Sequence, residues 1–328
     1  MPNLRVLSLS DTKIVELPSD ISNLFSLQYL DLSRTEIKKL PIEIKDLIKL
    51  KSLKLYCTHK LCSIPRGLIS SLSMLQMVNI YRCGFYESDG NESLVEELDS
   101  LKYLTTLHTT IASAAVLKRF LSSKKLLSCT RALCLKMFNG SNSLNLSSLQ
   151  NIKHLTWLRM EDFNTLREIS FDWVEYSNLS SMVECFHCLG TVHIYRCQML
   201  KNLTWLIFAP NLLYLTIEEC DKLEEVIGKG AEDGGNLSPY TKLIRLQLFC
   251  LPQLKSLYWN PLPFLHLDRI VVGSCPKLKK LPLNSSSAKE HRCVIRGEEE
   301  WWNELEWEDE ATLNAFLPCF EATFEQGT

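Results

Sequence analysis

The segment Leu4-Arg5-Val6-Leu7-Ser8-Leu9-Ser10-Asp11-Thr12-Lys13-Ile14 returns 23 residues later as Leu27-Gln28-Tyr29-Leu30-Asp31-Leu32-Ser33-Arg34-Thr35-Glu36-Ile37. The agreement extends to Leu17-Pro18 and Leu40-Pro41, and a third copy begins at Leu50. The shared unit reads Leu-x-x-Leu-x-Leu-x-x-(Thr/Cys)-x-(Ile/Leu). An internal repeat therefore organises the chain, and its period is the first clue to the fold.

Looser copies of the unit continue through most of the sequence. Each keeps the alternating apolar residues, as Leu212, Leu215 and Ile217 do. Copies that begin near 104 and 130 are degenerate. Counting all of them gives eleven starts, at residues 4, 27, 50, 75, 104, 130, 155, 189, 212, 243 and 267. A period of about 20 to 29 residues with this pattern is typical of the leucine-rich repeat.

The spacing predicts one short β-strand in each copy, because alternate residues of a strand point to opposite faces. No copy can bury its own apolar side, so neighbouring copies must stack. We therefore expect an α/β leucine-rich-repeat solenoid, a horseshoe with parallel strands on its concave face and irregular or helical segments on its convex side. The Thr or Cys of the unit should lie buried beneath the turn after the strand, as a small residue can. That position is held by Cys83, Cys197, Cys220 and Cys275.

Some segments depart from the repeat. Residues 91–104 and 111–127 have helical apolar spacing and are predicted to form amphipathic helices on the convex side. Residues 228–239 predict a loop rich in Gly and Asp. Residues 298–310 hold eight acidic residues and three Trp, and residues 311–317 predict a short helix that Pro318 ends. We therefore expect a solenoid over residues 1–283 and, over residues 284–328, a C-terminal cap with an acidic, Trp-rich tail.

Composition and charge exclude several classes of protein. With 46% apolar and 23% charged residues, the 328-residue chain is globular rather than disordered. Its 36 basic and 38 acidic residues give no basic field, so no nucleic-acid partner is expected. The most apolar stretch, residues 203–215, is too short and interrupted for a membrane span. The N-terminus lacks the apolar region of a signal peptide. We therefore predict a cytoplasmic, intracellular protein that is not secreted, with its 13 Cys reduced.

Several stretches resemble one known family. These are Leu212-Leu213-Tyr214-Leu215-Thr216-Ile217-Glu218-Glu219-Cys220, Cys275-Pro276-Lys277-Leu278-Lys279-Lys280-Leu281-Pro282 and Arg296-Gly297-Glu298-Glu299-Glu300-Trp301-Trp302-Asn303. They look like the repeats of plant disease resistance proteins of the coiled-coil, nucleotide-binding, leucine-rich-repeat class. The resemblance covers essentially the whole chain, but only the repeat region of that family. The phosphate loop of a nucleotide-binding module is missing, and Gly228-Lys229-Gly230 is its nearest approach. No ATP, ADP or other cofactor is therefore expected.

The resemblance implies a role in plant innate immunity. It implies protein partners, either pathogen effectors or host proteins that effectors modify, and an autoinhibitory contact with a nucleotide-binding module. The sequence does not tell which effector or guarded protein is involved, or whether the chain oligomerises. Outward residues beside the strand leucines are the candidate contacts, because Tyr, Trp and Arg are enriched at interface hot spots. These candidates on the concave face are Tyr29, Arg34, Tyr56, Tyr81, Arg82, Trp157, Arg159, Tyr195, Arg196, Tyr214, Glu218, Arg245, Phe249 and Arg269.

Two kinds of chemistry are rejected. Cys185, Cys188, His193 and Cys197 approach the spacing of a zinc site. The repeat register, however, buries Cys197 and turns His193 outward, which would splay the ligands apart, so no metal is expected. The seven His are scattered, and no Ser, Cys or carboxylate pattern converges on them. We therefore expect no catalytic residues and no enzyme activity.

Two alternative functions have sequence signatures that are missing here. A stand-alone repeat scaffold, such as the substrate-recognition arm of a ubiquitin ligase, would be favoured by an F-box-like segment before the repeats. An apoplastic receptor ectodomain would be favoured by a leader and paired cap cysteines. The first copy begins at Leu4 with no cap before it. We therefore expect a fragment of a longer chain, with a bare apolar edge that makes it poorly soluble alone.

Overall fold

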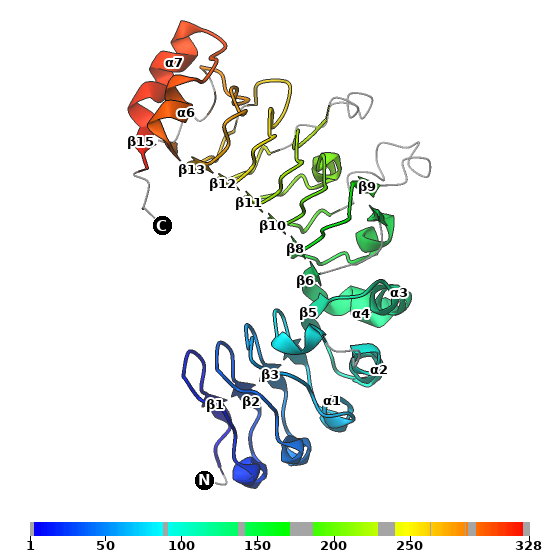
Figure 1. The fold of residues 1–328 in the computed structure, drawn as a ribbon. Helices are drawn as coiled ribbons and strands as arrows, with labels where there is room; N and C mark the ends of the chain where they lie inside the picture. The colour runs from blue at the N-terminus through cyan, green and yellow to red at the C-terminus, as the bar shows by residue number, and fades with distance from the viewer. Residues whose placement is uncertain are drawn as a thin grey trace. The chain divides into compact units, whose positions relative to one another are not determined.

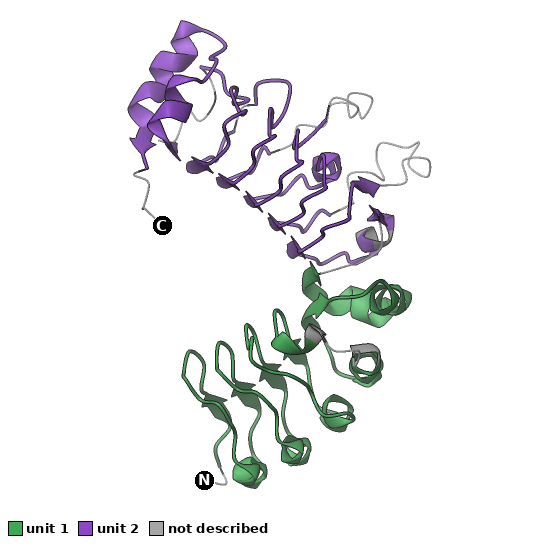
Figure 2. Ribbon diagram, in the orientation of Figure 1, with its two compact units in different colours: residues 1–136 green, residues 137–328 purple. Residues whose placement is uncertain are grey.

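The computed structural model describes residues 3–87, 91–136, 142–170, 186–228, 240–262, 264–285, 287 and 293–323. The chain divides into two compact units, which are residues 1–136 and residues 137–328 (Figure 2). Each unit contains its own set of parallel strands with buried leucines on one side. The outward faces of these two sets hold all of the candidate contact residues.

Unit 1 is a parallel sheet whose strands follow the order of the chain. Its strands are β1 (Val6–Ser8), β2 (Tyr29–Asp31), β3 (Ser52–Lys54), β4 (Met77–Asn79), β5 (Thr106–Ile111) and β6 (Thr130–Lys136). Within this unit the strands line one side and the helical segments the other, except for η3 (Gly84–Glu87), which lies beside the strand ends (Figure 1). The helical segments are the 3-10 helices η1 (Ser19–Asn23), η2 (Ile42–Asp46) and η3 and the α-helices α1 (Leu68–Ser71), α2 (Asn91–Ser100), α3 (Ala114–Ser122) and α4 (Lys124–Cys129).

Unit 2 repeats the arrangement and adds elements at its end. The main parallel strands are β8 (Trp157–Glu161), β10 (Thr191–Tyr195), β11 (Tyr214–Glu218), β12 (Arg245–Phe249), β13 (Arg269–Gly273), β14 (Val294–Gly297) and β15 (Phe320–Ala322). A separate parallel pair joins β7 (Ser143–Asn145) to β9 (Glu168–Ser170). The helical elements are η4 (Ser147–Asn151), η6 (Thr204–Phe208), α6 (Glu299–Asn303), α7 (Glu310–Phe316) and η8 (Leu317–Cys319).

The predicted parallel repeat fold is confirmed. Every one of the eleven predicted copies supplies a strand, including the two degenerate ones, which form β5 and β6. The register aligns equivalent core residues of neighbouring copies, so that Leu30 lies between Leu7 and Leu53. Leu30 is 1% exposed and Leu53 is fully buried. Stacking of copies therefore buries the apolar side that no single copy could bury.

The turn after the strand has the same backbone form in nine of the eleven copies. The residue before the Thr or Cys position adopts a left-handed conformation although it is never Gly, as for Arg34 (φ 55°) and Arg196 (φ 50°). Its N–H donates to a carbonyl of the next copy, 2.7 Å from the Tyr56 oxygen for Arg34. The Thr35 hydroxyl donates back to the Leu32 carbonyl at 2.7 Å. Such bonds offset the cost of about 1 kcal/mol that a left-handed non-Gly residue carries.

The predicted buried position of the motif cysteines is confirmed. Cys83, Cys197, Cys220 and Cys275 are all buried. The thiol of Cys275 points to the Gly273 carbonyl, two residues back, at 3.4 Å, whereas the Thr hydroxyls of the first copies donate to the carbonyl three residues back. Burial raises the pKa of the Cys83 and Cys275 thiols to about 12. These side chains therefore stay protonated and structural near neutral pH.

The predicted helices are present, with different bounds. Residues 91–104 contain α2, which ends at Ser100. Residues 111–127 are not one helix, because Ile111 belongs to β5 and Ser123 separates α3 from α4. The Ser123 side chain accepts a hydrogen bond from the Leu126 N–H and so begins a new helix, as Ser commonly does. The predicted loop over residues 228–239 lies outside the described residues apart from Gly228.

The chain after residue 283 adds strands as well as helices. Strand β14 pairs with β13 and β15 pairs with β14, so the parallel ladder of unit 2 continues into this segment. Trp301 is buried and donates from its indole nitrogen to the Leu278 carbonyl at 2.8 Å. The short helix predicted over residues 311–317 is α7, which Asp309 caps. The division at residue 283 itself stays a prediction.

At the other end, β1 pairs with β2, and no described residue pairs with its opposite side. Val6 is 60% exposed, and Leu7 is only half-buried, unlike its equivalent Leu30. The core position of the first copy is therefore less covered than its equivalent in the second. Separately, none of the helices in the described part of the chain combines the length and apolar character needed to cross a membrane.

Candidate functional site

In unit 1, the outward face brings aromatic and cationic candidates together in pairs. The guanidinium of Arg34 lies over the ring of Tyr56, 5.5 Å from its centre, and is 3.5 Å from the Asp11 carboxylate. Tyr29, on the neighbouring β2, is exposed. This end of the face therefore offers an aromatic ring and a guanidinium to solvent.

Tyr81 is a correction to the sequence prediction, because it is only 3% exposed. It follows β4 and packs against Ala132 and Cys134 of β6, with Tyr56 beside it at 6.1 Å between ring centres. Since Ala132 and Cys134 are small outward residues, the Tyr81 ring lies down over them instead of projecting. Tyr81 supports the face and offers little surface to a partner.

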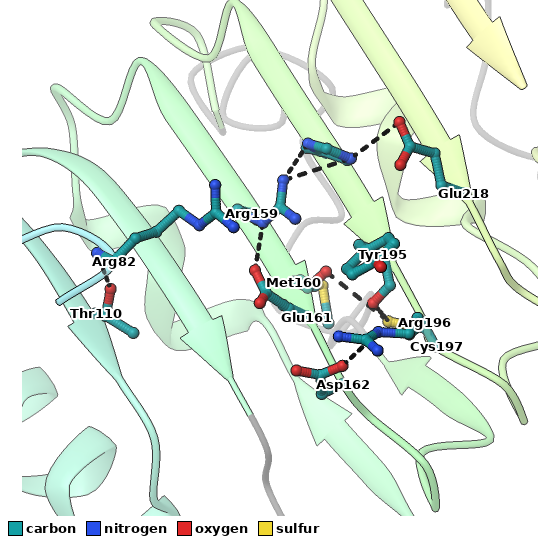
Figure 3. Close-up of polar contacts among 11 residues, drawn as sticks. Arg82, Thr110, Arg159, Met160, Glu161, Asp162, Tyr195, Arg196, Cys197 and Glu218 are labelled. Carbon is teal, nitrogen blue, oxygen red and sulfur yellow. Dashed lines mark hydrogen bonds and ion pairs between the residues drawn. The ribbon is translucent and has the colours of Figure 1, made fainter. Parts of the chain in front are cut away.

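Arg82, the next candidate, follows the same turn rule as Arg34. Its left-handed backbone (φ 58°) sends its N–H to the Thr110 hydroxyl at 2.9 Å, where earlier copies use a carbonyl (Figure 3). Its side chain is half-buried. The backbone of Arg82 is thus held in place independently of what its guanidinium contacts.

In unit 2, four charged or titratable side chains form a chain across β8, β10 and β11. The Arg159 Nε lies 2.5 Å from a Glu161 carboxylate oxygen, with the two side chains only 9% and 7% exposed. Arg159 also hydrogen-bonds the His193 ring. The His193 Nε2 lies 3.6 Å from the Glu218 carboxylate, which completes the series (Figure 3). A carboxylate therefore lies at each end of the series, with the guanidinium and the imidazole between them.

Tyr195 lies between two guanidiniums at the centre of this cluster. The Arg159 guanidinium is 5.3 Å from the centre of its ring and that of Arg196 is 4.5 Å away. Arg196 is in turn 2.8 Å from the Asp162 carboxylate. A Tyr ring held by two cations has few alternative rotamers, so less conformational entropy is lost when a partner packs on it.

The electrostatics of the cluster follow from these contacts. The neighbouring His193 ring lowers the pKa of the Glu218 carboxyl, and the nearby Arg159 charge lowers it further, against the opposing effect of partial burial. Glu218 is therefore ionised throughout the neutral range.

The remaining candidates lie on β8 and on β11 to β13. Trp157, Tyr214 and Arg245 are exposed, and Phe249 and Arg269 are half-buried. The register places Tyr214 beside Arg245 and Arg245 beside Arg269. The structure therefore gathers the unit 2 candidates on one sheet, in a cluster of paired side chains and a more open row.

Sequence reasoning missed several members of the cluster. Glu161 and Asp162 were not among the candidates, and His193 entered only as a possible zinc ligand. The alternation of Arg159 and Glu161, two residues apart on one strand, is the signal that could have found the ion pair. The predicted starts at 155 and 189 already place Arg159 beside His193, and the register agrees, but the sequence does not show that the two side chains turn toward each other.

The structure describes three of the four residues of the rejected zinc site, Cys188, His193 and Cys197. His193 lies on the outward face, while Cys197 is buried with its sulfur 3.7 Å from the Tyr195 carbonyl. Cys185 lies outside the described residues. Within the described ranges, no group of three or more His, Cys, Asp or Glu is placed to hold a metal ion.

Comparisons with known proteins agree with the fold. A family model described as a leucine-rich repeat region matches residues 1–291. The disease resistance protein UNI of Arabidopsis thaliana is 38% identical over 98% of this chain and 36% of its own length. A probable disease resistance protein of the same plant is 40% identical over 98% of this chain and 33% of its own length. Among solved structures, the functional domain of InlJ from Listeria monocytogenes is 15% identical with a TM-score of 0.48, and covers 98% of this chain and 59% of that one.

The parallel repeat and the family model define the class of protein: the chain belongs to the leucine-rich repeat family. Its curated relatives are plant disease resistance proteins, which confirms the resemblance seen in the sequence. The chain spans about a third of the length of these relatives. Leucine-rich repeats typically bind proteins, so the homology is consistent with a protein-interaction module in plant defence.

Proposed function

We propose that the chain is the recognition region of a cytoplasmic plant immune receptor, and that its outward strand face binds a pathogen effector or an effector-modified host protein. One observation carries the proposal: Tyr195 is held between Arg159 and Arg196, which are themselves paired with acidic groups. Rigid Tyr and Arg side chains at the centre of a surface are the usual anchors of protein interfaces. No chemistry is proposed for this face.

The proposal also assigns the chain a part in autoinhibition. In the complete protein, a nucleotide-binding module would contact the repeats in the resting state, and an effector would compete with that contact. The resemblance to resistance proteins supports this arrangement. A substitution in the contact would weaken the resting state and produce a response without an effector.

The test is a response assay in leaves with the complete gene product. Effectors of a plant pathogen would be co-expressed one by one until one triggers cell death. We expect Tyr195→Ala and Arg196→Ala to abolish that response at equal protein level. Arg167→Ala is the matched control, because Arg167 is exposed outside the main sheet of unit 2. A full response from both face variants would refute recognition by this surface.

A further inference from the structure

Most charged groups on the outward face of unit 2 are closely paired within the chain, but those of one row are not. The row consists of Tyr214 on β11, Arg245 and Gln247 on β12 and Arg269 on β13, and we call it the open donor row (β11 to β13 in Figure 1). The register places Arg245 directly beside both Tyr214 and Arg269. Since neighbouring strands are about 4.8 Å apart, these side chains share one small surface.

The groups of this row are hydrogen-bond donors whose capacity is almost unused. The Arg269 Nε is buried and has no hydrogen-bond partner among the described residues. Among the described residues, Arg245 has one acidic neighbour, the Asp268 carboxylate at 3.8 Å from its Nε. The Arg245 and Asp268 side chains are 52% and 53% exposed. An ion pair so long and so exposed contributes little.

Gln247 is oriented by the strand before it. Its carbonyl oxygen accepts a hydrogen bond from the Thr216 hydroxyl at 3.2 Å, and its amide nitrogen has no partner within the described part of the chain. Donors from Arg245, Gln247 and Arg269 thus lie next to one another on two strands. Two like charges placed side by side on a sheet are unfavourable in isolation.

The surroundings restrict what could satisfy these donors. Phe249 lies along the next outward position of β12, and its ring leans over Gly273, where an added Cβ would come within 3.1 Å. Tyr214, the member of the row on β11, lies beside Arg245. A ligand must therefore bring acceptor oxygens and negative charge to the arginines and fit between two aromatic side chains.

We propose that the open donor row binds a side-chain carboxylate of an extended acidic segment of the partner protein. This inference rests on the proposed function and names the chemistry of the partner. A carboxylate accepts two hydrogen bonds in parallel from one guanidinium and can be shared by two. It would satisfy the buried Arg269 Nε and remove the repulsion between Arg245 and Arg269. The cluster around Arg159 has no such vacancy, because Glu161 and Glu218 already supply its carboxylates.

The test uses the chain with a terminally blocked, rhodamine-labelled peptide of alternating Ser and Glu, read by fluorescence anisotropy. Three further probes are the same peptide with Gln for Glu, a phosphoserine peptide and inorganic phosphate as competitor. We expect the Glu peptide to bind more tightly than the Gln peptide and to weaken as salt rises. Arg245→Gln and Arg269→Gln should each reduce its affinity about tenfold. Arg167→Gln should leave the affinity within about twofold of wild type.

Several results would overturn the inference. These are no binding of the Glu peptide, equal binding of the Gln peptide, or unchanged affinity in Arg269→Gln. Binding of the phosphoserine peptide without the Glu peptide would assign the row to phosphate instead. Arg269→Lys keeps the charge but loses the paired donors, so an intermediate loss is expected. Unchanged thermal unfolding of each variant shows that the fold is intact.

Failure here is distinguishable from failure of the proposed function. Peptide binding reports on Arg245 and Arg269, whereas the leaf assay reports on Tyr195 and Arg196. A receptor that responds to its effector, loses that response in Tyr195→Ala and shows no acidic-peptide binding would overturn the open donor row alone.

Discussion

At the scale of single residues, Arg159 and Glu161 form an ion pair whose two side chains are almost fully buried. Removing one partner of a buried ion pair leaves the other charge uncompensated, which costs about 3–5 kcal/mol. We expect Arg159→Ala to lower the free energy of unfolding by about that amount. The double variant Arg159→Met with Glu161→Leu should recover most of the loss, because it removes both charges and keeps the volume.

Urea unfolding followed by circular dichroism measures this effect. Arg245→Ala is the matched control, because its guanidinium is 52% exposed and only weakly paired. A single Arg159→Ala variant that unfolds at the wild-type midpoint would show that water solvates Glu161, contrary to the burial described.

His108 in β5 gives a pH dependence with a definite sign. Burial lowers the pKa of His108 below its ordinary value of 6.5, and the charges of Arg131 and Lys54 lower it further. The unfolded chain therefore takes up this proton before the folded chain does. The contribution of His108 to stability is complete above pH 6.5 and declines as the pH falls below that value.

We expect His108→Gln to remove this part of the acid destabilisation. Thermal unfolding at pH 7.5 and at about pH 5 should differ less in the variant than in wild type. The exposed His154 provides the control, since His154→Gln should leave the difference unchanged. A variant that keeps the full wild-type pH dependence would contradict the assignment to His108.

At the scale of the element, helix α1 depends on a carboxylate from its neighbour. The Glu97 side chain, on α2, accepts hydrogen bonds from the N–H groups of Gly67 at 2.7 Å, Ile69 at 3.0 Å and Ser70 at 3.1 Å. Gly67 enters the helix at φ 77°, a left-handed conformation that Gly adopts without strain. The charge of Glu97 also complements the positive end of the helix.

We expect Glu97→Ala to destabilise unit 1 by about 1–2 kcal/mol, as loss of a helix cap does. Hydrogen exchange at Ile69 and Ser70 should accelerate more than exchange at the core strands. Glu16→Ala, at an exposed position outside α1 and α2, should change neither. Equal protection of the two amides in wild type and Glu97→Ala would mean that water replaces the carboxylate.

The elements differ in how well the sequence predicts them. The strands follow from local alternation plus repetition, so even the degenerate copies supply strands where predicted, as β5 and β6. The register between these two was not predicted, because it shifts between Leu107 and His108. The break at Ser123 was missed because apolar spacing continues across it from α3 into α4. Strands β14 and β15 were missed because each shows only a short alternating segment, and Cys293-Val294-Ile295 was read as part of a tail.

The candidate face was predictable as a list of outward positions, but not as a set of contacts. Alternation correctly turns Tyr195 and Arg245 outward. It cannot show that Tyr81 lies flat, since this depends on the small size of Ala132 and Cys134 two strands away. Nor can alternation distinguish Arg159, which is paired with Glu161, from Arg269, whose Nε has no hydrogen-bond partner among the described residues. Both are arginines at outward positions.

At the scale of the whole molecule, the bare side of β1 governs behaviour in solution. Its apolar Val6 is 60% exposed, and the backbone groups on that side have no partner among the described residues. Such an edge favours pairing between copies of the chain. We expect the isolated chain to associate with rising concentration in gel filtration.

Val6→Lys should reduce that association, because a charge on an edge strand opposes pairing. Val15→Lys is the control, since Val15 is also exposed but lies outside β1. A wild-type chain that elutes as a monomer at every concentration and unfolds in one cooperative step would contradict the expectation.

The left-handed turn found in nine of the copies affects which substitutions the fold tolerates. Its geometry is set by a backbone N–H, not by the side chain, and the position accordingly holds Asp11, Arg34, Cys57, Glu219 and Ser274, among others. None of the nine left-handed positions holds a β-branched residue, which this conformation disfavours most strongly, and in the copy where Ile111 takes the equivalent position the backbone continues as strand β5 instead. The turn is therefore a place where mutation can exchange acid for base or for thiol at little cost to folding. Under selection by changing partner proteins, the surface chemistry at these turn positions could vary while the repeat fold stays the same.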